Sequence, residues 1–567
     1  MNLFRHLSTR RAKEAASHEI DPEDVFLDSQ NLSSLNINQM EGQLSRPLGV
    51  QVYYLFTFFI IILFGATIFR LFSMQITSFA SYQEKADRNH LRTTPIFAHR
   101  GTISDVNGNL LAWNSSKGEL YEIPDRVYTT TPGFSHLLGY VSYPKKDQSG
   151  VFWQDEYIGR DGIEKQYQDR LSGIRGEKVI AVTALHKIEA ENVTIDPTNG
   201  ENLKLTIDKG VQAKLYESME ALAHKAFFTS GAGVIMDVNT GAVLAIASYP
   251  EYNNNLITNA TSTEDKRILA KDLLDKNNKF LNRAVAGLFT PGSTVKPYMA
   301  IAALMEDIIT PEKNIYSSGQ LVIKNKYGGP DSIFKDWKAH GYTDMRKALA
   351  ESSDEYFYQI GGGFEGQKGL GIVRINKYSK LFGFGTTTGI DLPAETYGNV
   401  PSPEWKKKVF NQDWLLGDTY HTSIGQYGFQ LTPLELVRAT ASIANGGYLV
   451  TPHMIDGVVT ASTSINLKEK DLKVIREGMH MVVHASNGTG LALNIDGVDV
   501  AAKSGTAELG VSKQLVNSLI SGYFPYDNPK YAFVVVMEKG DRHNPYGAVF
   551  VMQDVLTWMR DNTGYTK

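Results

Sequence analysis

Residues 47–69 contain no charged side chain, and no other segment of the chain is as restricted in the folds open to it. The run lies between Arg46 and Arg70 and is almost wholly aromatic and aliphatic at 54–64. Lipid offers no hydrogen-bond partners, so a segment of this length crosses the hydrocarbon layer, about 30 Å thick, as a helix. A helix buried in a soluble core is the alternative. A cleaved signal peptide fits less well, because the run starts far from the N-terminus and no small-residue cleavage site follows closely. We expect a transmembrane helix at 47–70.

The rest of the chain has the composition of a folded protein. Its 567 residues exceed one ordinary domain, and 42% apolar with 21% charged residues is typical of globular chains. Residues 1–46, in contrast, are polar and rich in Ser and Asn, which predicts a mostly disordered cytoplasmic tail. The net charge of −4 shows no excess of basic residues of the kind that binds nucleic acid, so we expect no nucleic-acid partner. There is no cysteine and no His-Glu-x-x-His motif, so we expect no catalytic metal and no cofactor.

The pattern of apolar runs predicts two folded regions after the membrane helix. Residues 71–205 contain short strand-like runs broken by Gly, Pro and Asn. Residues 206–567 open with an amphipathic helix at 211–223 and close with a helix at 549–560. Five strand-like runs lie near the two ends of this second region, at 233–238, 242–248, 498–502, 518–523 and 531–537. We expect them to form an antiparallel sheet packed by helices on its faces, which is an α+β fold.

Three short motifs occur in a fixed order in the second region. They are Ser293-Thr294-Val295-Lys296, Ser352-Ser353-Asp354 and Lys503-Ser504-Gly505. Ser-x-x-Lys alone is uninformative, because it also occurs at 142–145 and 332–335. The copy at Ser293 differs because Phe-Thr-Pro-Gly turns the chain just before it and an apolar helical run follows. We therefore expect Ser293 at a helix N-terminus, where free N–H groups and the helix dipole favour developing negative charge.

Together these motifs describe an acyl-transfer site. A serine hydroxyl is a poor nucleophile until a base takes its proton, and Lys296 shares the helix face of Ser293. Lysine acts as a base only while neutral, which burial and a second cation would favour, and Lys503 is the expected cation. For an isolated Ser-x-x-Lys the alternative is a solvated helix surface. For Ser352 and Ser353 the alternative is capping of the helix that follows.

Further segments extend the pattern over nearly everything after residue 47. They are Arg100-Gly101-Thr102-Ile103-Ser104-Asp105, Asn107-Gly108, Gly162-Ile163-Glu164 with Tyr167, Leu171-Ser172-Gly173, Pro291-Gly292 with Pro297, Gly425-Gln426, Thr432-Pro433, Ala444-Asn445-Gly446-Gly447, Thr506-Ala507-Glu508 and Gly522-Tyr523-Phe524-Pro525. With these segments the chain resembles the penicillin-binding proteins, specifically the monofunctional, membrane-anchored transpeptidases of class B. The resemblance implies a transpeptidase domain at 206–567, with a five-stranded antiparallel sheet and flanking helices. It also implies an elongated, β-rich pedestal of the dimerisation type at 71–205.

The resemblance also implies roles for the residues of the first two motifs. Ser293 would be the nucleophile and Lys296 its base, while Ser352 would relay a proton between Lys296 and the leaving amine. Asp354 stands where the family more often has Asn. A carboxylate accepts hydrogen bonds from lysine but cannot donate one to a substrate carbonyl, and it favours charged Lys296, which works against the base role.

The third motif would form the far wall of the cleft. Lys503, Ser504 and Thr506 would meet the carboxylate of a peptide's C-terminal D-Ala. The backbone N–H groups of Ser293 and Thr506 would form the oxyanion hole. Gly505 would let the strand approach the substrate without a Cβ clash.

The function implied is a D,D-transpeptidase that cross-links peptidoglycan stem peptides ending in D-Ala-D-Ala and is inhibited by β-lactams. A D,D-carboxypeptidase or a β-lactamase is the hydrolytic alternative, and a β-lactam-sensing or inactive scaffold protein is the non-enzymatic one. The membrane helix and pedestal favour transpeptidation over a β-lactamase, which needs neither. Sensors usually carry several spans and a cytoplasmic effector domain, whereas one span is expected here.

The expected location is the bacterial cytoplasmic membrane, with a single pass and the C-terminal domains outside, on the periplasmic or cell-wall side. The positive-inside rule alone does not predict this orientation, because Arg70 and further basic residues follow the span while only Arg46 closely precedes it. No glycosyltransferase domain is recognisable, so the resemblance implies pairing with a SEDS-family glycan polymerase and other elongation or division proteins. The helix at 47–69 and the pedestal are the surfaces expected to contact it; the alternative is that the helix is only an anchor.

Overall fold

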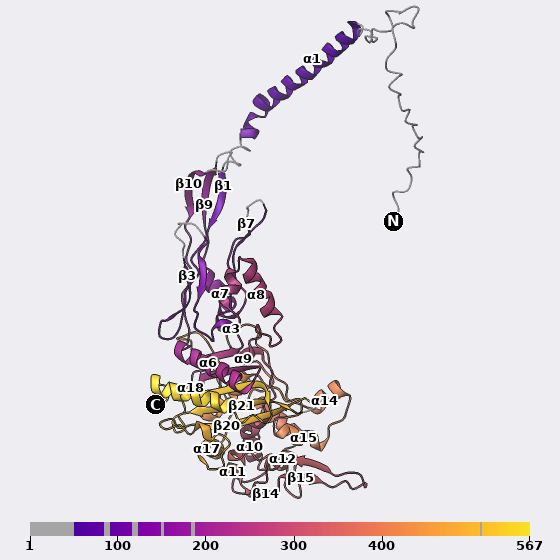
Figure 1. Ribbon diagram of the computed structural model, residues 1–567, viewed down its shortest axis with the longest axis vertical. Coiled ribbons are helices and arrows are strands. Elements are labelled where there is room, and N and C mark those ends of the chain that lie inside the picture. Colours follow the sequence, from indigo (N-terminus) through magenta and orange to yellow (C-terminus); the bar gives the residue numbers. More distant parts are fainter. Residues whose placement is uncertain (1–49, 84–90, 116–122, 149–151, 183–187, 511–512) are drawn as a thin grey trace, which may run out of the picture. The chain divides into compact units, whose positions relative to one another are not determined.

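The computed structural model describes residues 50–83, 91–115, 123–148, 152–182, 188–510 and 513–567 (Figure 1). The tail predicted for residues 1–46 lies outside the described residues. The chain divides into two compact units, residues 1–92 and 93–567.

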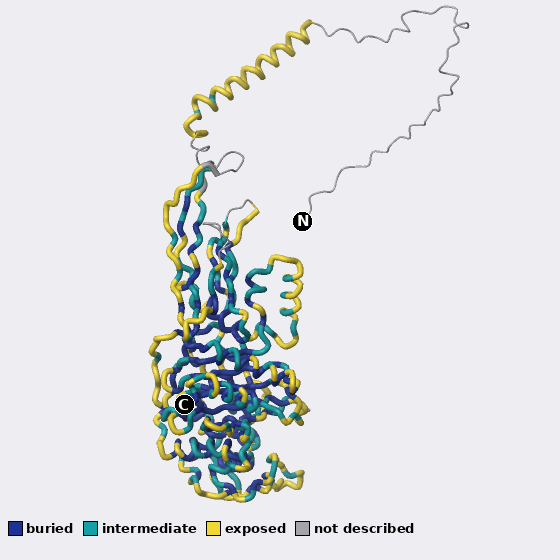
Figure 2. Tube along the Cα trace, turned by 60° about the vertical axis from the view of Figure 1, so that its left-hand side comes forward, coloured by how far each residue is buried: buried dark blue, intermediate teal, exposed yellow. Residues whose placement is uncertain are grey.

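The first unit contains the helix predicted from the uncharged run. Helix α1 (Val50–Phe72) continues into a π-helical turn, η3 (Ser73–Thr77), and the combined 28 residues are long and apolar enough to cross a membrane. All residues of α1 are exposed (Figure 2), as expected for a segment whose solvent is lipid. The helix extends past the predicted end at residue 70, because Arg70 is followed by further apolar residues and a long basic side chain can reach the interface.

After α1 the chain forms two sheets of three and four strands, and two further sheets of two strands each (Figure 1). The three-stranded sheet contains β1 (Leu91–Ile96), β9 (Gly176–Val182) and β10 (Ile188–Ile195) in that order. The four-stranded sheet has the order β11 (Leu203–Lys204), β2 (Ile103–Ser104), β3 (Leu110–Ser115) and β4 (Asp125–Tyr128). The short elements between them are α3 (Ser135–Leu138), β5 (Val141–Ser142), β6 (Lys145–Lys146), β7 (Phe152–Gln154), β8 (Ile158–Gly159), α4 (Gly162–Gln166) and α5 (Gln168–Ser172).

A buried ion cluster holds this part together. The Glu164 carboxylate accepts from Arg100 Nε at 2.5 Å and from Arg126 Nε at 2.7 Å, and all three side chains are fully buried. Burial alone would raise the pKa of Glu164, but the charges of Arg126 and Arg100 hold it below its ordinary value. The cluster links β4 and the segment before β2 to helix α4.

A five-stranded antiparallel sheet is the centre of the C-terminal part, as predicted. Its order is β13 (Val243–Tyr249), β12 (Ser230–Asp237), β22 (Tyr531–Asp541), β21 (Leu515–Phe524) and β20 (Ala501–Leu509). Strands from both ends of the region pair in the middle of the sheet, where Val234 of β12 lies opposite Val534 of β22. The strands are buried almost throughout (Figure 2), because helices cover both faces.

Alternate residues of each central strand face different helices. Ile235 packs with the cluster around α6 (Lys209–Ala226) and α18 (Ala548–Asn562), whereas Val234 and Met236 pack with the larger core that includes α16 (Pro433–Ala444). Between β13 and β20 the chain forms the remaining elements. These are α7 (Asn254–Asn259), α8 (Thr263–Leu273), α9 (Arg283–Ala286), η4 (Gly292–Val295), α10 (Lys296–Met305), β14 (Ile315–Ser317), β15 (Gln320–Ile323), β16 (Ser332–Lys335), β17 (Gly341–Thr343), α11 (Met345–Ala350), α12 (Asp354–Gly362), α13 (Gly371–Leu381), α14 (Pro403–Phe410), α15 (Leu416–Ser423), β18 (Tyr448–Val450), β19 (Ser462–Ser464), α17 (Glu469–His484) and η5 (Leu491–Leu493).

The fifth predicted strand has different ends in the structure. The apolar run at 498–502 predicted a strand that stops before the Lys-Ser-Gly motif, but β20 begins at Ala501 and continues through the motif to Leu509. Each of its nine residues pairs with β21. The polar motif is therefore held in strand conformation by its neighbour and not by its own propensity.

Candidate active site

Ser293 lies in a tight turn that leads directly into a buried helix. It is in the 3₁₀ turn η4, and α10 begins three residues later at Lys296. Gly292 has φ +53°, a left-handed conformation that glycine adopts without a Cβ penalty, so the chain reverses immediately before the serine. Thr294 fixes the turn by donating from Oγ1 to the Pro291 carbonyl at 2.8 Å. Ser293 is half-buried, and its neighbours Gly292 and Thr294 are buried.

Lys296 is fully buried beneath this turn and points toward the second motif. Its Nζ donates to Asp354 Oδ1 at 2.6 Å and to the Ser352 carbonyl at 2.7 Å, and lies 3.3 Å from Ser352 Oγ. No hydrogen bond joins Lys296 to the Ser293 hydroxyl in the described part of the chain. Lys296 therefore follows Ser293 by three residues, but its Nζ forms hydrogen bonds with Ser352 and Asp354 of the second motif.

The two serines of the second motif have different positions. Ser353 caps α12, accepting a hydrogen bond from the Tyr356 N–H at 3.3 Å, so the capping alternative applies to this residue. Ser352 precedes the cap with φ +57°, which costs a non-glycine residue about 1–2 kcal/mol. This conformation turns both the carbonyl and the hydroxyl of Ser352 toward Lys296. Backbone strain of this kind is concentrated at functional sites.

Lys503 reaches the same serine hydroxyl from β20. Its fully buried Nζ donates to Ser352 Oγ at 2.9 Å and to the Ser504 carbonyl at 2.9 Å. Burial, and then the charge of Lys296, lower the pKa of Lys503 well below its ordinary value, while Asp354 opposes the shift. Burial raises the pKa of Asp354, against the charge of Lys296. Burial of Lys503 therefore works against the role of second cation that the sequence predicts for it.

The remaining residues of the third motif alternate along the strand. Ser504 is half-buried and donates to Thr489 Oγ1 at 2.7 Å, whereas Thr506 is exposed. A Cβ at Gly505 would lie 2.8 Å from Thr294 Cγ2 and 2.9 Å from the Pro291 carbonyl oxygen. The glycine therefore lets β20 approach the turn that carries Ser293. The role predicted from the sequence, close approach of the strand to a substrate, stays a prediction.

Two further glycines complete this backbone contact. A Cβ at Gly292 would lie 2.6 Å from the Thr506 carbonyl oxygen, and one at Gly425 would lie 2.2 Å from the Gly292 carbonyl oxygen. The Gly292 N–H also donates to the Gly425 carbonyl at 3.0 Å. The turn that carries Ser293 is thus clamped between β20 and the 425–428 turn.

The structure brings residues of the three motifs together where η4, α10, α12 and β20 contact one another. Helices α10 and α12 and strand β20 are labelled in Figure 1. Sequence reasoning missed Thr489, which holds the Ser504 hydroxyl from a loop after α17. It also missed Asp336, whose Oδ2 accepts from Ser353 Oγ at 3.0 Å and from the Glu355 N–H at 2.8 Å. Neither residue belongs to a short motif, so no local signal identified them.

Comparisons with known proteins identify the family of the chain. The family model for the penicillin binding protein transpeptidase domain matches residues 231–550, and the model for the penicillin-binding protein dimerisation domain matches residues 119–205. The peptidoglycan D,D-transpeptidase MrdA of Haemophilus influenzae is 31% identical over 84% of this chain and 87% of its own.

The chain is also similar to solved structures of penicillin-binding proteins. In the complex of penicillin-binding protein PBP2 with MreC from Helicobacter pylori, the matching chain is 27% identical, with a TM-score of 0.69 over 83% of this chain and 99% of that one. A chain in a structure described as a peptidoglycan synthase complex that coordinates polymerization and crosslinking is 26% identical, with a TM-score of 0.70 over 91% of this chain and 99% of that one.

Proposed function

Since the chain belongs to the penicillin-binding proteins with a transpeptidase domain, we propose that it is a serine D,D-transpeptidase whose nucleophile is Ser293. Its substrates are peptidoglycan stem peptides that end in D-Ala-D-Ala, and β-lactams acylate the same serine. The observation that carries this assignment is the hydrogen-bonded chain from Lys296 through Ser352 to Lys503, next to the turn that presents Ser293.

In the first half-reaction the Ser293 oxygen attacks the carbonyl of the penultimate D-Ala, and the serine proton passes to Lys296. The C–N bond then breaks, and the terminal D-Ala leaves as an amine that takes up a proton through Ser352. The peptide is left as an ester on Ser293. In the second half-reaction an amine of an acceptor stem attacks this ester, forms the cross-link and releases the serine.

The third motif positions the donor peptide. Lys503, Ser504 and Thr506 hold the terminal carboxylate, and Thr506 is exposed as this role requires. The N–H groups of Ser293 and Thr506 stabilise the oxyanion, and the close approach of the Thr506 backbone to Gly292 supports this pairing.

The chain is anchored in the membrane, and we place its C-terminal domains outside, where the stem peptides are. We assign residues 71–205 to the pedestal, with 71–77 still part of the helix, and 206–567 to the catalytic domain. Family models that match residues 119–205 and 231–550 support the two assignments. A multi-span SEDS-class glycan polymerase is the proposed partner, and the similar chain from a complex that couples polymerization to crosslinking supports this choice.

Aromatic side chains of α1 offer packing area to such a partner within the membrane, since Tyr54, Phe58 and Phe59 are exposed. Replacing residues 47–69 with an unrelated membrane span tests the contact. Loss of co-isolation with the polymerase is expected. If the polymerase still co-isolates and is still stimulated, the helix is only an anchor and the pedestal is the contact.

Labelling with fluorescent penicillin tests the nucleophile. Ser293→Ala is expected to abolish labelling while the protein stays folded, and Ser142→Ala and Ser332→Ala are matched controls because each begins another Ser-x-x-Lys. Mass spectrometry that locates the adduct on Ser142 or Ser332 would overturn the assignment. Incubation with donor peptide and acceptor amine then distinguishes cross-linking from hydrolysis by the product formed.

A further inference from the structure

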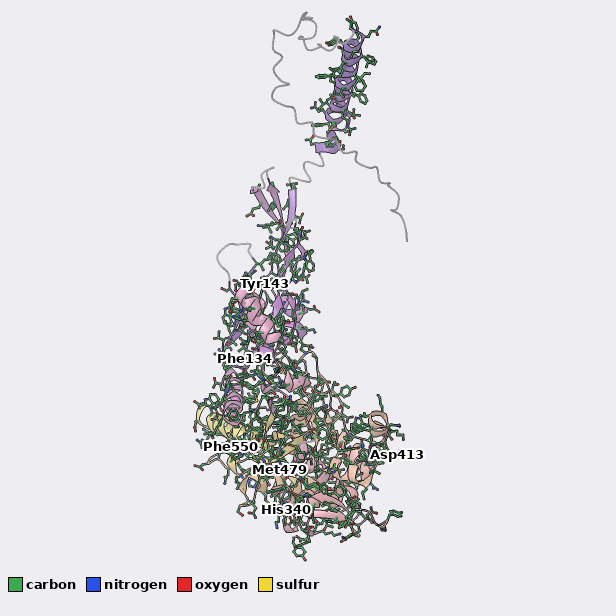
Figure 3. The ribbon with its side chains drawn as sticks, turned by 45° about the vertical axis from the view of Figure 1, so that its right-hand side comes forward. Phe134, Tyr143, His340, Asp413, Met479 and Phe550 are labelled. Atoms are coloured by element: carbon green, nitrogen blue, oxygen red, sulfur yellow. The ribbon has the colours of Figure 1, made fainter. Side chains whose placement is uncertain are left out.

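A cluster of two histidines and one aspartate lies outside the proposed catalytic residues. His480 and His484 are one turn apart on α17, the helix on which Met479 is labelled in Figure 3. Asp499 comes from the segment just before β20. The Asp499 Oδ1 atom lies 2.8 Å from His480 Nε2 and 3.2 Å from His484 Nε2. One possible ligand atom from each of the three residues therefore lies within 4.8 Å of the other two.

Neighbouring groups hold the cluster in this arrangement. The His480 ring stacks on Tyr526 with centroids 4.2 Å apart, and the His484 ring lies 4.1 Å from it on the other side at an interplanar angle of 30°. The Asp499 carbonyl accepts from the Tyr526 N–H at 3.0 Å, which fixes the backbone on the carboxylate side. Both histidines therefore direct the same ring nitrogen to one carboxylate oxygen.

We propose that His480, His484 and Asp499 bind one divalent transition-metal ion of the Zn²⁺ type, with water as the remaining ligand. Two imidazole nitrogens and one carboxylate oxygen are donors that Zn²⁺ accepts, whereas Mg²⁺ and Ca²⁺ prefer oxygen alone. Zn–ligand bonds of about 2.0–2.1 Å in a tetrahedron place neighbouring donor atoms roughly 3.3 Å apart. The two measured separations of 2.8 and 3.2 Å are close to this value, so small shifts admit the ion.

The spacing of the two histidines supports the same conclusion. Histidines at i and i+4 share one face of a helix, as in helical zinc sites. The pair is not a His-Glu-x-x-His motif, because position 481 is Met. Zinc in this cluster is not catalytic. It joins the end of α17 to the start of β20 and so closes the segment 485–498.

That segment carries Thr489, whose hydroxyl accepts the hydrogen bond from Ser504 in the wall of the proposed active site. A bound ion would therefore stabilise the loop behind the cleft without touching substrate. The alternative is that the three side chains form only a hydrogen-bonded ion cluster at a helix C-terminus, where protonated histidines interact favourably with the dipole.

Metal binding to the full-length protein in detergent, first stripped with a chelator, distinguishes these two cases. The variants are His480→Gln, His484→Gln and Asp499→Asn, and the control is His224→Gln, which removes an exposed histidine of α6. Zn²⁺ is titrated against a chromophoric chelator, and Co²⁺ is used to obtain the visible absorption of a tetrahedral site. Melting temperatures are measured with and without Zn²⁺, and with Mg²⁺ or Ca²⁺ at the same concentration.

The wild type and the control are expected to bind one Zn²⁺ per chain at this site and to melt at higher temperature when it is present. Each ligand variant is expected to lose at least about tenfold in affinity and to lose the thermal shift. Equal Zn²⁺ binding by the wild type and all three ligand variants would overturn the proposal. It would also fail if the variants melted lower without metal while Zn²⁺ had no effect on the wild type, because this is the behaviour of an ion cluster alone.

Discussion

Gly505→Ala is the substitution that most directly tests how the site is assembled. The new methyl group would lie 2.8 Å from Thr294 Cγ2 and 2.9 Å from the Pro291 carbonyl oxygen. Both contacts are with the turn that carries Ser293, and the oxygen belongs to the backbone and cannot rotate away. The strand and the turn must therefore separate.

The size of the effect follows from these distances. Ordinary contacts begin near 3.4 Å, so β20 has to move by about half an ångström or more relative to the turn. Overpacking of this kind costs about 1–3 kcal/mol of unfolding free energy. A displacement approaching 1 Å between catalytic groups costs about a hundredfold in rate. We therefore expect slower acylation by a β-lactam, by up to about a hundredfold, in a protein that still folds.

Stopped-flow or gel-based acylation with fluorescent penicillin measures the rate, and thermal melting measures the stability. Gly564→Ala is the matched control, because no atom lies within 4 Å of its new methyl group, and it should behave like the wild type. Acylation of Gly505→Ala at the wild-type rate, with an unchanged melting temperature, would refute the idea that this glycine sets the spacing between strand and nucleophile.

Substitutions at three other positions test the roles of Lys296, Asp354 and Glu164. Lys296→Ala should slow β-lactam acylation about a thousandfold if the lysine is the base, which the labelling rate at saturating drug will show. Asp354→Asn should be tolerated, because an amide oxygen can still accept the hydrogen bond from Lys296. Asp354→Ala removes that acceptor and should impair acylation by a β-lactam. Full activity of both variants would show that the side chain contributes nothing. Glu164→Gln should lower the unfolding free energy at pH 7 by about 3–5 kcal/mol, since it leaves two buried arginines without a counter-ion. Because the pKa of Glu164 is held below its ordinary value in the folded state, its stabilisation is present above pH 4.5 and is lost as the pH falls below that. The melting temperatures of wild type and Glu164→Gln should therefore converge in acid, and a constant difference would argue against the ion cluster.

The sheet was predictable because its strands are buried on both faces. Four of the five predicted apolar runs coincide with β12, β13, β21 and β22 to within a few residues. The fifth run missed most of β20, because a polar Lys-Ser-Gly sequence has no strand signal of its own and takes its conformation from pairing with β21. The apolar helix α1 was predictable from its composition, but its end was not, since the helix continues past residue 70.

The site was predictable as a set of residues but not as a geometry. Short motifs indicated Ser293, Lys296 and Lys503, yet the contact between Lys296 and Ser352 joins residues 56 positions apart and depends on tertiary packing. The left-handed backbone of Ser352 also has no sequence signal, because serine does not favour it. The structure also shows that Gly505 lies against the turn at Pro291–Thr294, and the distance between a strand and a distant turn cannot be read from a tripeptide.

The charges of the site explain why a donor with a terminal carboxylate suits it. Lys296 and Lys503 are both fully buried, and Asp354 contacts Lys296 directly, whereas no carboxylate among the described residues forms an ion pair with Lys503. Burial and the neighbouring lysine accordingly lower the pKa of Lys503. A ligand carboxylate held by the β20 wall supplies the missing negative charge and favours the ammonium form of Lys503. That ammonium donates to the Ser352 hydroxyl, which in turn lies beside Lys296. Recognition of the carboxylate is thereby linked, through two buried hydrogen bonds, to the lysine next to the nucleophile.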